Sequence, residues 1–339
     1  MECRRLGRTG LEVSVLGFGC GSVGGLFVRG DRRDMASAFA RAIDLGINYF
    51  DTAPSYGDGL SETNLGLALK ELRSDVVIGT KVLLTTKDME NIERAIFESV
   101  EASLKRLRRD RIDLMQLHNP VGLQRQADQR RANADDAKVS VDDVEVSIQV
   151  FQKLQRQGKV RSWGITGLGD TPALHRVVSA GHADTIQCCF NLINPTAGVQ
   201  IPDGFPFQNY EQLIERAARN QMGIIGIRVL AGGALSGSAA RHPNALQVVK
   251  PIASGQEFSD DVEQARRFNF LVERRYASDL VEAAIRFVIT KPEVSTALVG
   301  ISDLAQLERA AASANRGPLP PEAQRRLNEI WTDQLPIKN

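Results

Sequence analysis

The sequence has few cysteines: there are 4 among 339 residues, and two of them are adjacent. No two of them have zinc-site spacing, and an adjacent pair is a poor basis for a disulfide framework, so neither a metal nor a disulfide scaffold is expected. An excess of charge is also lacking, because 42 Lys and Arg offset 41 Asp and Glu. This balance argues against nucleic acid or an acidic membrane surface as a partner.

Long hydrophobic runs are lacking as well. No apolar stretch reaches the roughly 20 residues that span a bilayer, and the N-terminal segment lacks the apolar core of a signal peptide. We therefore expect no membrane association and a cytoplasmic location. The composition, 42% apolar and 24% charged, is typical of a globular protein. No composition break divides the chain, so residues 1–339 are expected to form one domain, and the sequence carries no signal for an oligomeric state.

Short apolar runs alternate with longer stretches of helical periodicity. The expected strands are Val13–Phe18, Ile47–Asp51, Val76–Lys81, Ile112–His118, Lys159–Thr166, Thr185–Cys189, Gly223–Arg228 and Thr296–Val299. The expected helices are Asp31–Leu45, Glu62–Leu72, Met89–Leu107, Asp143–Arg156, Pro172–Ala180, Tyr210–Asn220, Leu280–Thr290 and Leu304–Asn315. Strict alternation indicates parallel strands with helical crossovers. Eight strand–helix units in about 300 residues suit an α/β fold of the (β/α)8 TIM barrel type. A doubly wound open sheet is the alternative.

Three connections that follow strands are long, namely Asn119–Asp142, Leu192–Asn209 and Val229–Asp279. Connections after strands lie on the carboxyl-end face of a barrel, where barrel enzymes place their active sites. We expect these three to form a substrate rim and a cofactor cover, with tolerated surface insertion as the alternative. A last periodic segment, Pro320–Leu335, is expected to pack on the outside or to reach the rim.

Glycines follow the first expected strand. Gly19, Gly21 and Gly24 match the pattern G-x-G-x-x-G. A dinucleotide fingerprint of this kind needs a helix that opens at the glycines, because the N–H groups of its first turn bind the pyrophosphate. Here the next helical periodicity begins only near Asp31. A flexible first loop beside the active site is therefore favoured over a Rossmann site.

Four titratable side chains stand where apolar strands end. Asp51, Lys81 and His118 close three consecutive expected strands, and Tyr56 follows in the turn after the first of them. These strands are neighbours in a barrel, so the four side chains can converge. An ammonium lowers the pKa of a nearby phenol from its usual value of ~10, a carboxylate keeps that ammonium charged, and an imidazole can orient a substrate oxygen. The set predicts a proton donor for carbonyl reduction or, in reverse, alcohol oxidation.

Each of these residues has a plainer interpretation when it is taken alone. An Asp after a strand commonly caps a helix, a Tyr in a turn commonly packs, and a lone His is commonly structural. Their occurrence on consecutive strands favours catalysis. A Schiff-base aldolase that uses Lys81 is a second interpretation, but a lysine must be neutral to form a Schiff base, and the neighbouring Asp51 and Tyr56 fit the reductase better.

Longer strings surround the four residues. They are Gly46–Ala53 (GINYFDTA), Tyr56-Gly57, Ser61-Glu62, Thr80-Lys81 and Ser103–His118, with Arg5–Ser14 before them. These strings resemble the aldo-keto reductase superfamily, and in detail its aldose 1-dehydrogenase branch. The resemblance implies a barrel whose bottom is plugged by an N-terminal hairpin. It implies Tyr56 as general acid/base, Asp51 and Lys81 as its tuning pair, His118 as the residue that orients the substrate, and direct hydride transfer with a nicotinamide dinucleotide.

The resemblance also implies a cofactor site. Thr166 and Gln187 would bond the nicotinamide carboxamide, although Gly167 lacks the family's amide and Ile227 lacks its stacking aromatic ring. The other cofactor contacts implied are Asp51, Arg228, Leu230, Gly233, Leu235, Gly300, Ser302, Asp303 and Gln306. The resemblance implies NADP or NAD as the cofactor. We favour NAD, because no Lys or Arg precedes Arg309 in the segment that begins at Gly300, and because Asp303 would repel a 2′-phosphate.

The substrate implied is a small aldehyde, ketone or aldose, and oxidation of a sugar at C1 is a candidate for the physiological direction. Besides Tyr56 and His118, we expect Phe18 and Trp163 to line an apolar pocket mouth, with barrel packing as the alternative for Trp163. A non-catalytic nucleotide sensor, as in channel subunits of the same superfamily, is the alternative function.

Overall fold

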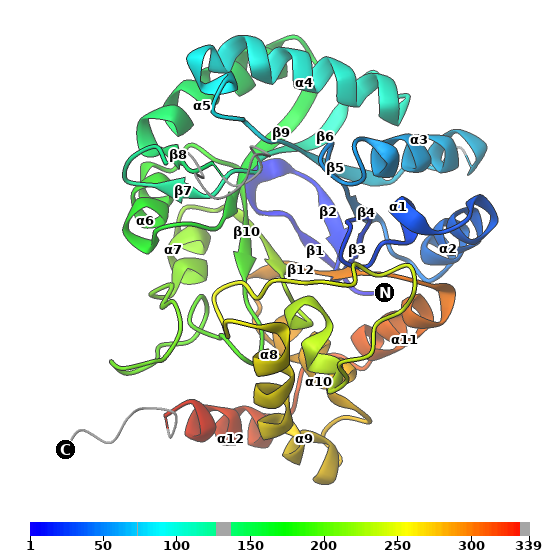
Figure 1. Cartoon of the computed structure of the whole chain (residues 1–339), viewed down its shortest axis with the longest axis vertical. Coiled ribbons are helices and arrows are strands. Elements are labelled where there is room, and N and C mark those ends of the chain that lie inside the picture. The colour runs from blue at the N-terminus through cyan, green and yellow to red at the C-terminus, as the bar shows by residue number, and fades with distance from the viewer. Residues whose placement is uncertain (73, 127–136, 333–339) are drawn as a thin grey trace.

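The computed structural model describes residues 1–72, 74–126 and 137–332. Eight parallel strands form a closed barrel (Figure 1). They are β3 (Leu16–Gly19), β4 (Tyr49–Asp51), β5 (Val77–Val82), β6 (Ile112–Leu117), β9 (Val160–Gly167), β10 (Thr185–Cys189), β11 (Gly223–Ile227) and β12 (Val294–Gly300). Each strand pairs with the next in the chain, and β12 pairs with β3, which closes the ring. The predicted barrel is confirmed, and the open sheet is excluded.

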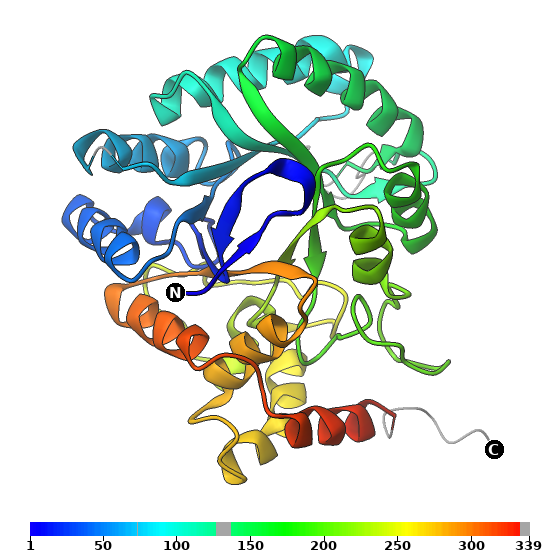
Figure 2. The ribbon, with the colours of Figure 1, turned by 180° about the vertical axis from the view of Figure 1, so that it is seen from behind.

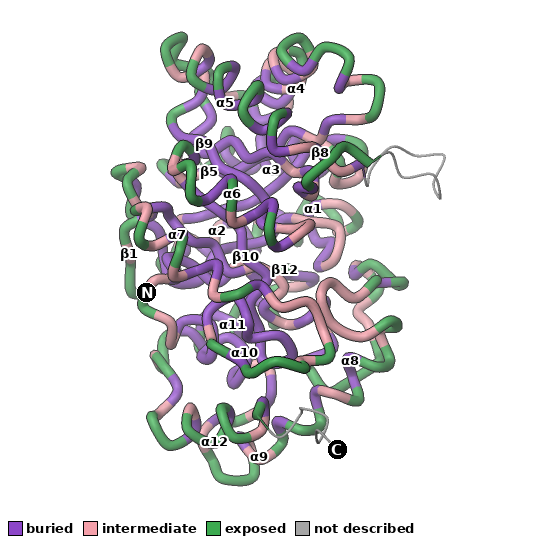
Figure 3. Tube along the Cα trace, turned by 90° about the vertical axis from the view of Figure 1, so that its left-hand side faces the viewer, coloured by how far each residue is buried: buried purple, intermediate pink, exposed green. Residues whose placement is uncertain are grey.

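Helices surround the barrel, one after each strand. They are α2 (Arg32–Asp44), α3 (Leu60–Leu72), α4 (Ile92–Leu107), α5 (Val141–Arg156), α6 (Thr171–Ala180), α7 (Leu213–Arg219), α10 (Leu280–Thr290) and α11 (Leu304–Asn315). Local chemistry sets where several of them begin: the Asp31 side chain accepts from the N–H of Asp34 at 2.8 Å, and Ser140 and Asp143 form a capping box. Figure 3 shows the barrel strands mostly buried, and exposed residues concentrated on the surrounding helices and loops.

The first expected strand is in fact two. The run Val13–Phe18 divides into β2 (Glu12–Ser14), which pairs antiparallel with β1 (Cys3–Arg5), and the barrel strand β3. The two strands are separated after Ser14, where the Ser14 hydroxyl donates to the carbonyl of Leu16 at 2.7 Å. A run of apolar residues does not reveal such a change of partner.

The hairpin of β1 and β2 closes the amino-end opening of the barrel, as Figure 2 shows from behind. Its apolar side chains pack into a small cluster with residues that point into the barrel. The cluster consists of Leu6, Leu11, Val13, Tyr49, Leu114 and Ile225. The predicted plug is therefore confirmed, and the carboxyl end is left as the accessible mouth.

Two of the three long connections contain short elements that the sequence pattern does not predict. The first holds β7 (Val121–Gly122) and β8 (Val139–Ser140), which pair with each other. The last holds η3 (Ala231–Ser236), α8 (Phe258–Ala265), η4 (Arg266–Phe268) and α9 (Phe270–Glu273). Short elements elsewhere are η1 (Gly7–Thr9), α1 (Leu26–Arg29) and η2 (Asp88–Glu90). Elements of two to eight residues are too short to show a period.

The last helix, α12 (Pro321–Thr332), lies outside the barrel, and its last turn packs against α10 and the connection after β10. Trp331 is buried, donates its indole N–H to the carbonyl of Leu192 just beyond β10 at 2.9 Å, and lies 5.5 Å from the ring of Phe287. Residues 333–335 of the segment expected here lie outside the described residues. No helix in the described ranges has both the length and the apolar character to cross a membrane.

The packing of α12 predicts a stability effect. Trp331→Ala removes a buried indole and its hydrogen bond, so the free energy of unfolding should fall by about 3–5 kcal/mol in chemical denaturation. Replacing the exposed Arg325 of the same helix with Ala is the control and should change stability little. Equal stability of the two variants would show that the contacts of Trp331 with Leu192 and Phe287 do not stabilise the fold.

Candidate active site

The carboxyl ends of three neighbouring strands bring the predicted acid–base residues together. Asp51 ends β4, Lys81 lies one residue from the end of β5, and His118 directly follows β6. These three strands pair in that order. Tyr56 lies in the turn between β4 and α3, where its N–H donates to the carbonyl of Ala53. The structure therefore brings all four residues to one place.

The ammonium of Lys81 connects the group. Nζ donates to the Asp51 carboxylate, to the carbonyl oxygen of Thr52 at 2.7 Å and to the Tyr56 hydroxyl at 3.2 Å. These three acceptors take the three N–H bonds of an ammonium. The Tyr56 ring also meets the His118 ring edge to face, with centroids 5.8 Å apart. The phenol thus contacts both a buried cation and an imidazole.

Burial competes with charge in setting the protonation of this group. Burial raises the pKa of Tyr56, while Lys81 lowers it without cancelling the effect of burial. The net lowering of the Tyr56 pKa that the sequence predicts is therefore absent, although Lys81 acts on this pKa in the expected direction. Burial alone would lower the Lys81 pKa, but Asp51 and Tyr56 outweigh it and raise that pKa. Burial, with Lys81, lowers the pKa of His118 to about 3, so this imidazole is neutral at pH 7.

Asp51 is held by more partners than the sequence predicts. Its Oδ2 accepts from the Tyr49 hydroxyl at 3.0 Å and from the Gln187 amide at 2.8 Å. Tyr49 fits beneath the site because Gly79 has no side chain, since a Cβ there would come 2.6 Å from the Tyr49 hydroxyl. In the sequence, Tyr49 resembles an ordinary buried strand residue. The one signal of its contact with Asp51 is that the two residues are two positions apart on β4, so both side chains point into the barrel.

A cavity of about 480 Å³ opens above the four residues, a size typical of small-molecule sites. The predicted residues that line it are Asp51, Tyr56, His118, Thr166, Gln187, Arg228, Leu230, Gly233, Gly300, Ser302 and Gln306. Lys81 is only 1% exposed and acts from behind Asp51 and Tyr56. Thr166 and Gln187 are register partners on β9 and β10, with Oγ1 and Oε1 3.5 Å apart.

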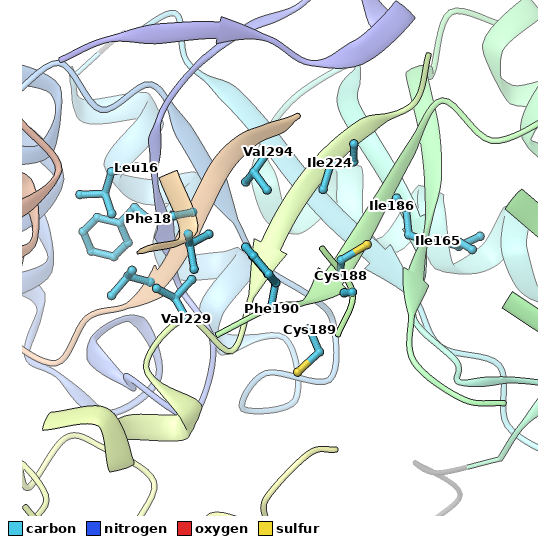
Figure 4. Packing of buried hydrophobic residues seen from close by; sticks show 14 of the residues in the cluster. Leu16, Phe18, Ile165, Ile186, Cys188, Cys189, Phe190, Ile224, Val229 and Val294 are labelled. Atoms are coloured by element: carbon cyan, nitrogen blue, oxygen red, sulfur yellow. The ribbon is translucent and has the colours of Figure 1, made fainter. Parts of the chain in front are cut away.

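The structure contradicts the prediction that Phe18 and Trp163 line the pocket. The Phe18 ring stacks on Phe50 with centroids 5.4 Å apart, and it belongs to the cluster of buried hydrophobic residues of which Figure 4 shows a part. The Trp163 ring stacks on Phe151 of α5 at 5.4 Å. Neither lines the cavity. Side chains alternate along a strand, so Phe18 points outward between the inward positions 17 and 19.

Two predicted cofactor residues also serve other purposes. The side chain of Leu235 is buried, and its N–H donates to the carbonyl of Leu230 at 3.1 Å. The Asp303 carboxylate caps α11 by accepting from the N–H of Gln306 at 2.7 Å, and it lies 3.3 Å from His242. Neither Leu235 nor Asp303 lines the cavity. The short motif that suggested a ribose contact at Asp303 is a helix start.

The glycine run after β3 is a close-packing feature rather than a helix-opening fingerprint. A Cβ on Gly24 would lie 2.3 Å from the backbone nitrogen of Ile301, beyond the end of β12. The Ser302 hydroxyl donates to the carbonyl of Gly24 at 2.7 Å. The long helix begins only at Arg32. The run does line the cavity, so its position beside the site agrees with the prediction.

The segment between η3 and α8 supplies cavity residues that sequence reasoning missed. They include Arg241, His242 and Ala245. The guanidinium of Arg241 donates to the carbonyl of Gly232 at 2.9 Å and lies 4.9 Å from the centre of the Phe258 ring. No local pattern marks such residues, because only the path of the loop brings them to the cavity.

Among the described residues, Arg228 has no carboxylate at ion-pair distance, although the charge of Asp261 opposes the lowering of the Arg228 pKa. Its backbone is left-handed, with φ of 55°. The guanidinium donates to the carbonyl of Lys250 at 3.4 Å, and burial lowers its pKa. Within residues 1–72, 74–126 and 137–332, no carboxylate forms an ion pair with Arg228 or with Arg241. Two unpaired guanidinium groups in one cavity favour an anionic ligand.

Comparison with known proteins gives one consistent result. A family model described as Aldo/keto reductase family matches residues 15–332. The chain is similar to L-galactose dehydrogenase of Arabidopsis thaliana, with 29% identity over 348 residues, covering 100% of this chain and 96% of that protein. It is similar to D-threo-aldose 1-dehydrogenase of a Pseudomonas species, with 28% identity and 90% of each chain covered. In fold it matches the holo form of aldo-keto reductase AKR11C1 from Bacillus halodurans, with a TM-score of 0.69, 24% identity, and 100% and 99% of the two chains covered.

The depressed pKa of His118, about 3, predicts how stability depends on pH. Below its ordinary pKa of 6.5, unfolded His118 takes up a proton that the folded protein excludes, so acid destabilises the fold. Between pH 8 and pH 5, wild type should lose about 2 kcal/mol more unfolding free energy than His118→Gln. His182→Gln, at an exposed histidine, is the control and should follow wild type. Parallel curves for wild type and His118→Gln would contradict a His118 that stays neutral in the folded protein.

Proposed function

The chain belongs to the aldo/keto reductase family of oxidoreductases, and we propose that it interconverts a carbonyl group and an alcohol with a nicotinamide dinucleotide and Tyr56 as the acid/base. The observation that carries this proposal is the contact of the Lys81 ammonium with the Tyr56 hydroxyl at 3.2 Å. The cavity gives a substrate oxygen access to Tyr56 and His118 together.

In the reducing direction, Tyr56 donates its proton to the substrate oxygen. The phenolate that remains is stabilised by the Lys81 ammonium, whose own charge Asp51 sustains. In the oxidising direction, the phenolate removes the hydroxyl proton of the alcohol. His118 is neutral at pH 7, so it contributes a hydrogen bond that positions the substrate oxygen and brings no second charge.

The residues along the cavity fit a dinucleotide. When it is bound, the nicotinamide supplies or accepts the hydride. Thr166 and Gln187 lie at the catalytic end, where the Gln187 amide now bonds Asp51 and is placed to bond a carboxamide as well. Arg228 and Arg241 offer unpaired positive charge for a diphosphate. Leu230, Gly233, Gly300, Ser302 and Gln306 complete the set that we assign to the cofactor.

We assign an aldehyde, ketone or aldose as the substrate. The support for an aldose is that two similar proteins are a galactose dehydrogenase and an aldose 1-dehydrogenase. Sugar oxidation at C1 is the direction that we favour. The cavity wall includes the apolar residues Leu168, Ile227 and Ile252.

Tyr56→Phe tests the proposed function. It removes the proton donor and keeps the ring, so turnover should fall by at least about 100-fold while the cofactor still binds. Turnover is followed by nicotinamide absorbance with a panel of aldoses and aldehydes, and cofactor binding by calorimetry. Multiple turnovers by wild type would exclude a role as a binding protein only. Unchanged turnover in the variant would refute Tyr56 as the acid/base.

We propose NAD as the cofactor, because the cation of the expected ribose segment is already neutralised by a carboxylate. The one cavity-lining cation in the described part of the α11 region, Arg309, has its guanidinium 2.6 Å from the Asp279 carboxylate. A cation neutralised in this way attracts a 2′-phosphate less than an unpaired one does. Asp303 does not line the cavity, so its charge contributes from a greater distance than the sequence suggested.

Asp279→Asn tests the choice of cofactor. Asn can still cap α10 by accepting from the N–H of Glu282, as Asp279 does at 2.9 Å, but it no longer neutralises Arg309. Wild type should bind NAD more tightly than NADP by calorimetry, and the variant should gain affinity for NADP by roughly five- to tenfold. Adding Arg309→Gln should remove that gain. A strong preference of wild type for NADP would overturn the assignment.

A further inference from the structure

The pair Ser61-Glu62 is a feature of the sequence that the proposed chemistry leaves unexplained. Both residues lie in the first turn of α3, both are completely buried, and neither lines the cavity. A fully buried glutamate is uncommon unless it is paired. Its partners lead back to Lys81.

Glu62 connects three elements of the barrel wall. Its Oε1 accepts from the Thr80 hydroxyl on β5 at 2.5 Å, and its Oε2 accepts from Nε of Arg106 on α4 at 2.6 Å. Thr80 immediately precedes Lys81 on β5, and because side chains alternate, Thr80 points toward the helices while Lys81 points into the barrel. The buried carboxylate therefore holds the outward face of the strand segment whose inward face carries the ammonium.

Ser61 holds the other side of the same ammonium. Its hydroxyl lies 2.7 Å from the Thr52 hydroxyl and donates to the carbonyl of Cys20 at 2.8 Å. The carbonyl of Thr52 is one of the three acceptors of Lys81. Two successive residues of α3 thus fix both an acceptor of the ammonium and the strand from which it extends.

We propose that Glu62, held by Arg106, is a positioning residue that keeps the Lys81 ammonium in contact with the Tyr56 hydroxyl by anchoring Thr80. This inference rests on the proposed function. A buried ion pair is weak evidence for stability, because apolar residues of equal volume often serve as well. Conformational specificity is the better explanation here, since the anchored strand carries the charge on which the phenol depends.

The consequence for the reaction follows from distance. If β5 is released, the ammonium is held less closely to the phenol, and the phenolate loses part of its stabilisation. The pKa of Tyr56, which Lys81 lowers against burial, then rises. Turnover falls and the pH profile moves to higher pH, while the affinity for the cofactor stays the same, because neither Glu62 nor Thr80 lines the cavity.

Thr80→Val is the sharpest test, because Val has the shape of Thr without its hydroxyl. We expect kcat to fall by about fivefold or more, with KM and the cofactor Kd unchanged and the limb of the pH–kcat profile that reports Tyr56 moved to higher pH. Thr80→Ser restores the hydroxyl and should restore both kcat and the profile. The titratable groups that face Lys81 and Tyr56 are unaltered in these variants: Asp51, His118, Arg228, Tyr49 and Cys20.

A matched control separates positioning from stability. Glu282 of α10 forms a second buried pair, with Arg286 at 2.8 Å, and does not line the cavity. Glu282→Gln should lower the melting temperature and leave the pH–kcat profile in place. Should Thr80→Val not fold, Glu62→Gln gives a related test, because its one neutral acceptor oxygen replaces the two carboxylate oxygens that accept from Thr80 and Arg106, so the charge-assisted bond from Thr80 is lost; it should move the profile to higher pH as well.

The outcomes are distinct. A shifted profile in Thr80→Val or Glu62→Gln, rescue in Thr80→Ser and none in the control support the inference. A wild-type profile in the folded Thr80 or Glu62 variant overturns it, even when the melting temperature falls. Tyr56→Phe is measured in parallel: if it is inactive and Thr80→Val is normal, only the positioning role fails, whereas an active Tyr56→Phe refutes the proposed function itself.

Discussion

The structure depends on one buried cation. The ammonium of Lys81 is removed from water, and the carboxylate of Asp51, the carbonyl of Thr52 and the hydroxyl of Tyr56 replace its hydration. An unpaired buried charge is so costly that these acceptors must be in place when the protein folds. The register of β4 and β5 and the turn after β4 place these acceptors around the ammonium. Among the three acceptors, the Tyr56 phenol is the one that can also exchange a proton with a substrate.

The surroundings of the cation also give a role to residues outside the acid–base group. Tyr49 and Gln187 hold the far oxygen of Asp51, and Gly79 leaves room for the Tyr49 ring. The neutral overall composition means that no long-range field draws a dinucleotide to the protein. Attraction must come from the cavity itself, where Arg228 and Arg241 lack carboxylate partners within the described ranges.

Most of the barrel and the acid–base group could be predicted from the sequence, because both are written in local patterns. Alternating apolar runs and helical periods reveal a barrel, and a polar residue that ends a buried strand stands out from its neighbours. Phe18 shows the limit of reasoning by residue type. Its ring would suit a pocket, but because its neighbours on β3 face inward, its side chain points outward and packs on Phe50. Asp303 shows a second limit, since a carboxylate before a helix serves as its cap. Arg241 could be assigned to the long connection Val229–Asp279, but not to the cavity, because only the folded path of that loop brings it there.

In the proposed reaction, the charge of Lys81 makes Tyr56 an effective acid and base. The most direct measurement is kcat for Lys81→Met against pH, together with the affinity of the variant for the cofactor. Loss of the ammonium should lower kcat by at least about 100-fold at neutral pH, with restored turnover only toward higher pH and with cofactor affinity retained. Turnover in Lys81→Met that equals wild type in rate and pH dependence would contradict the account.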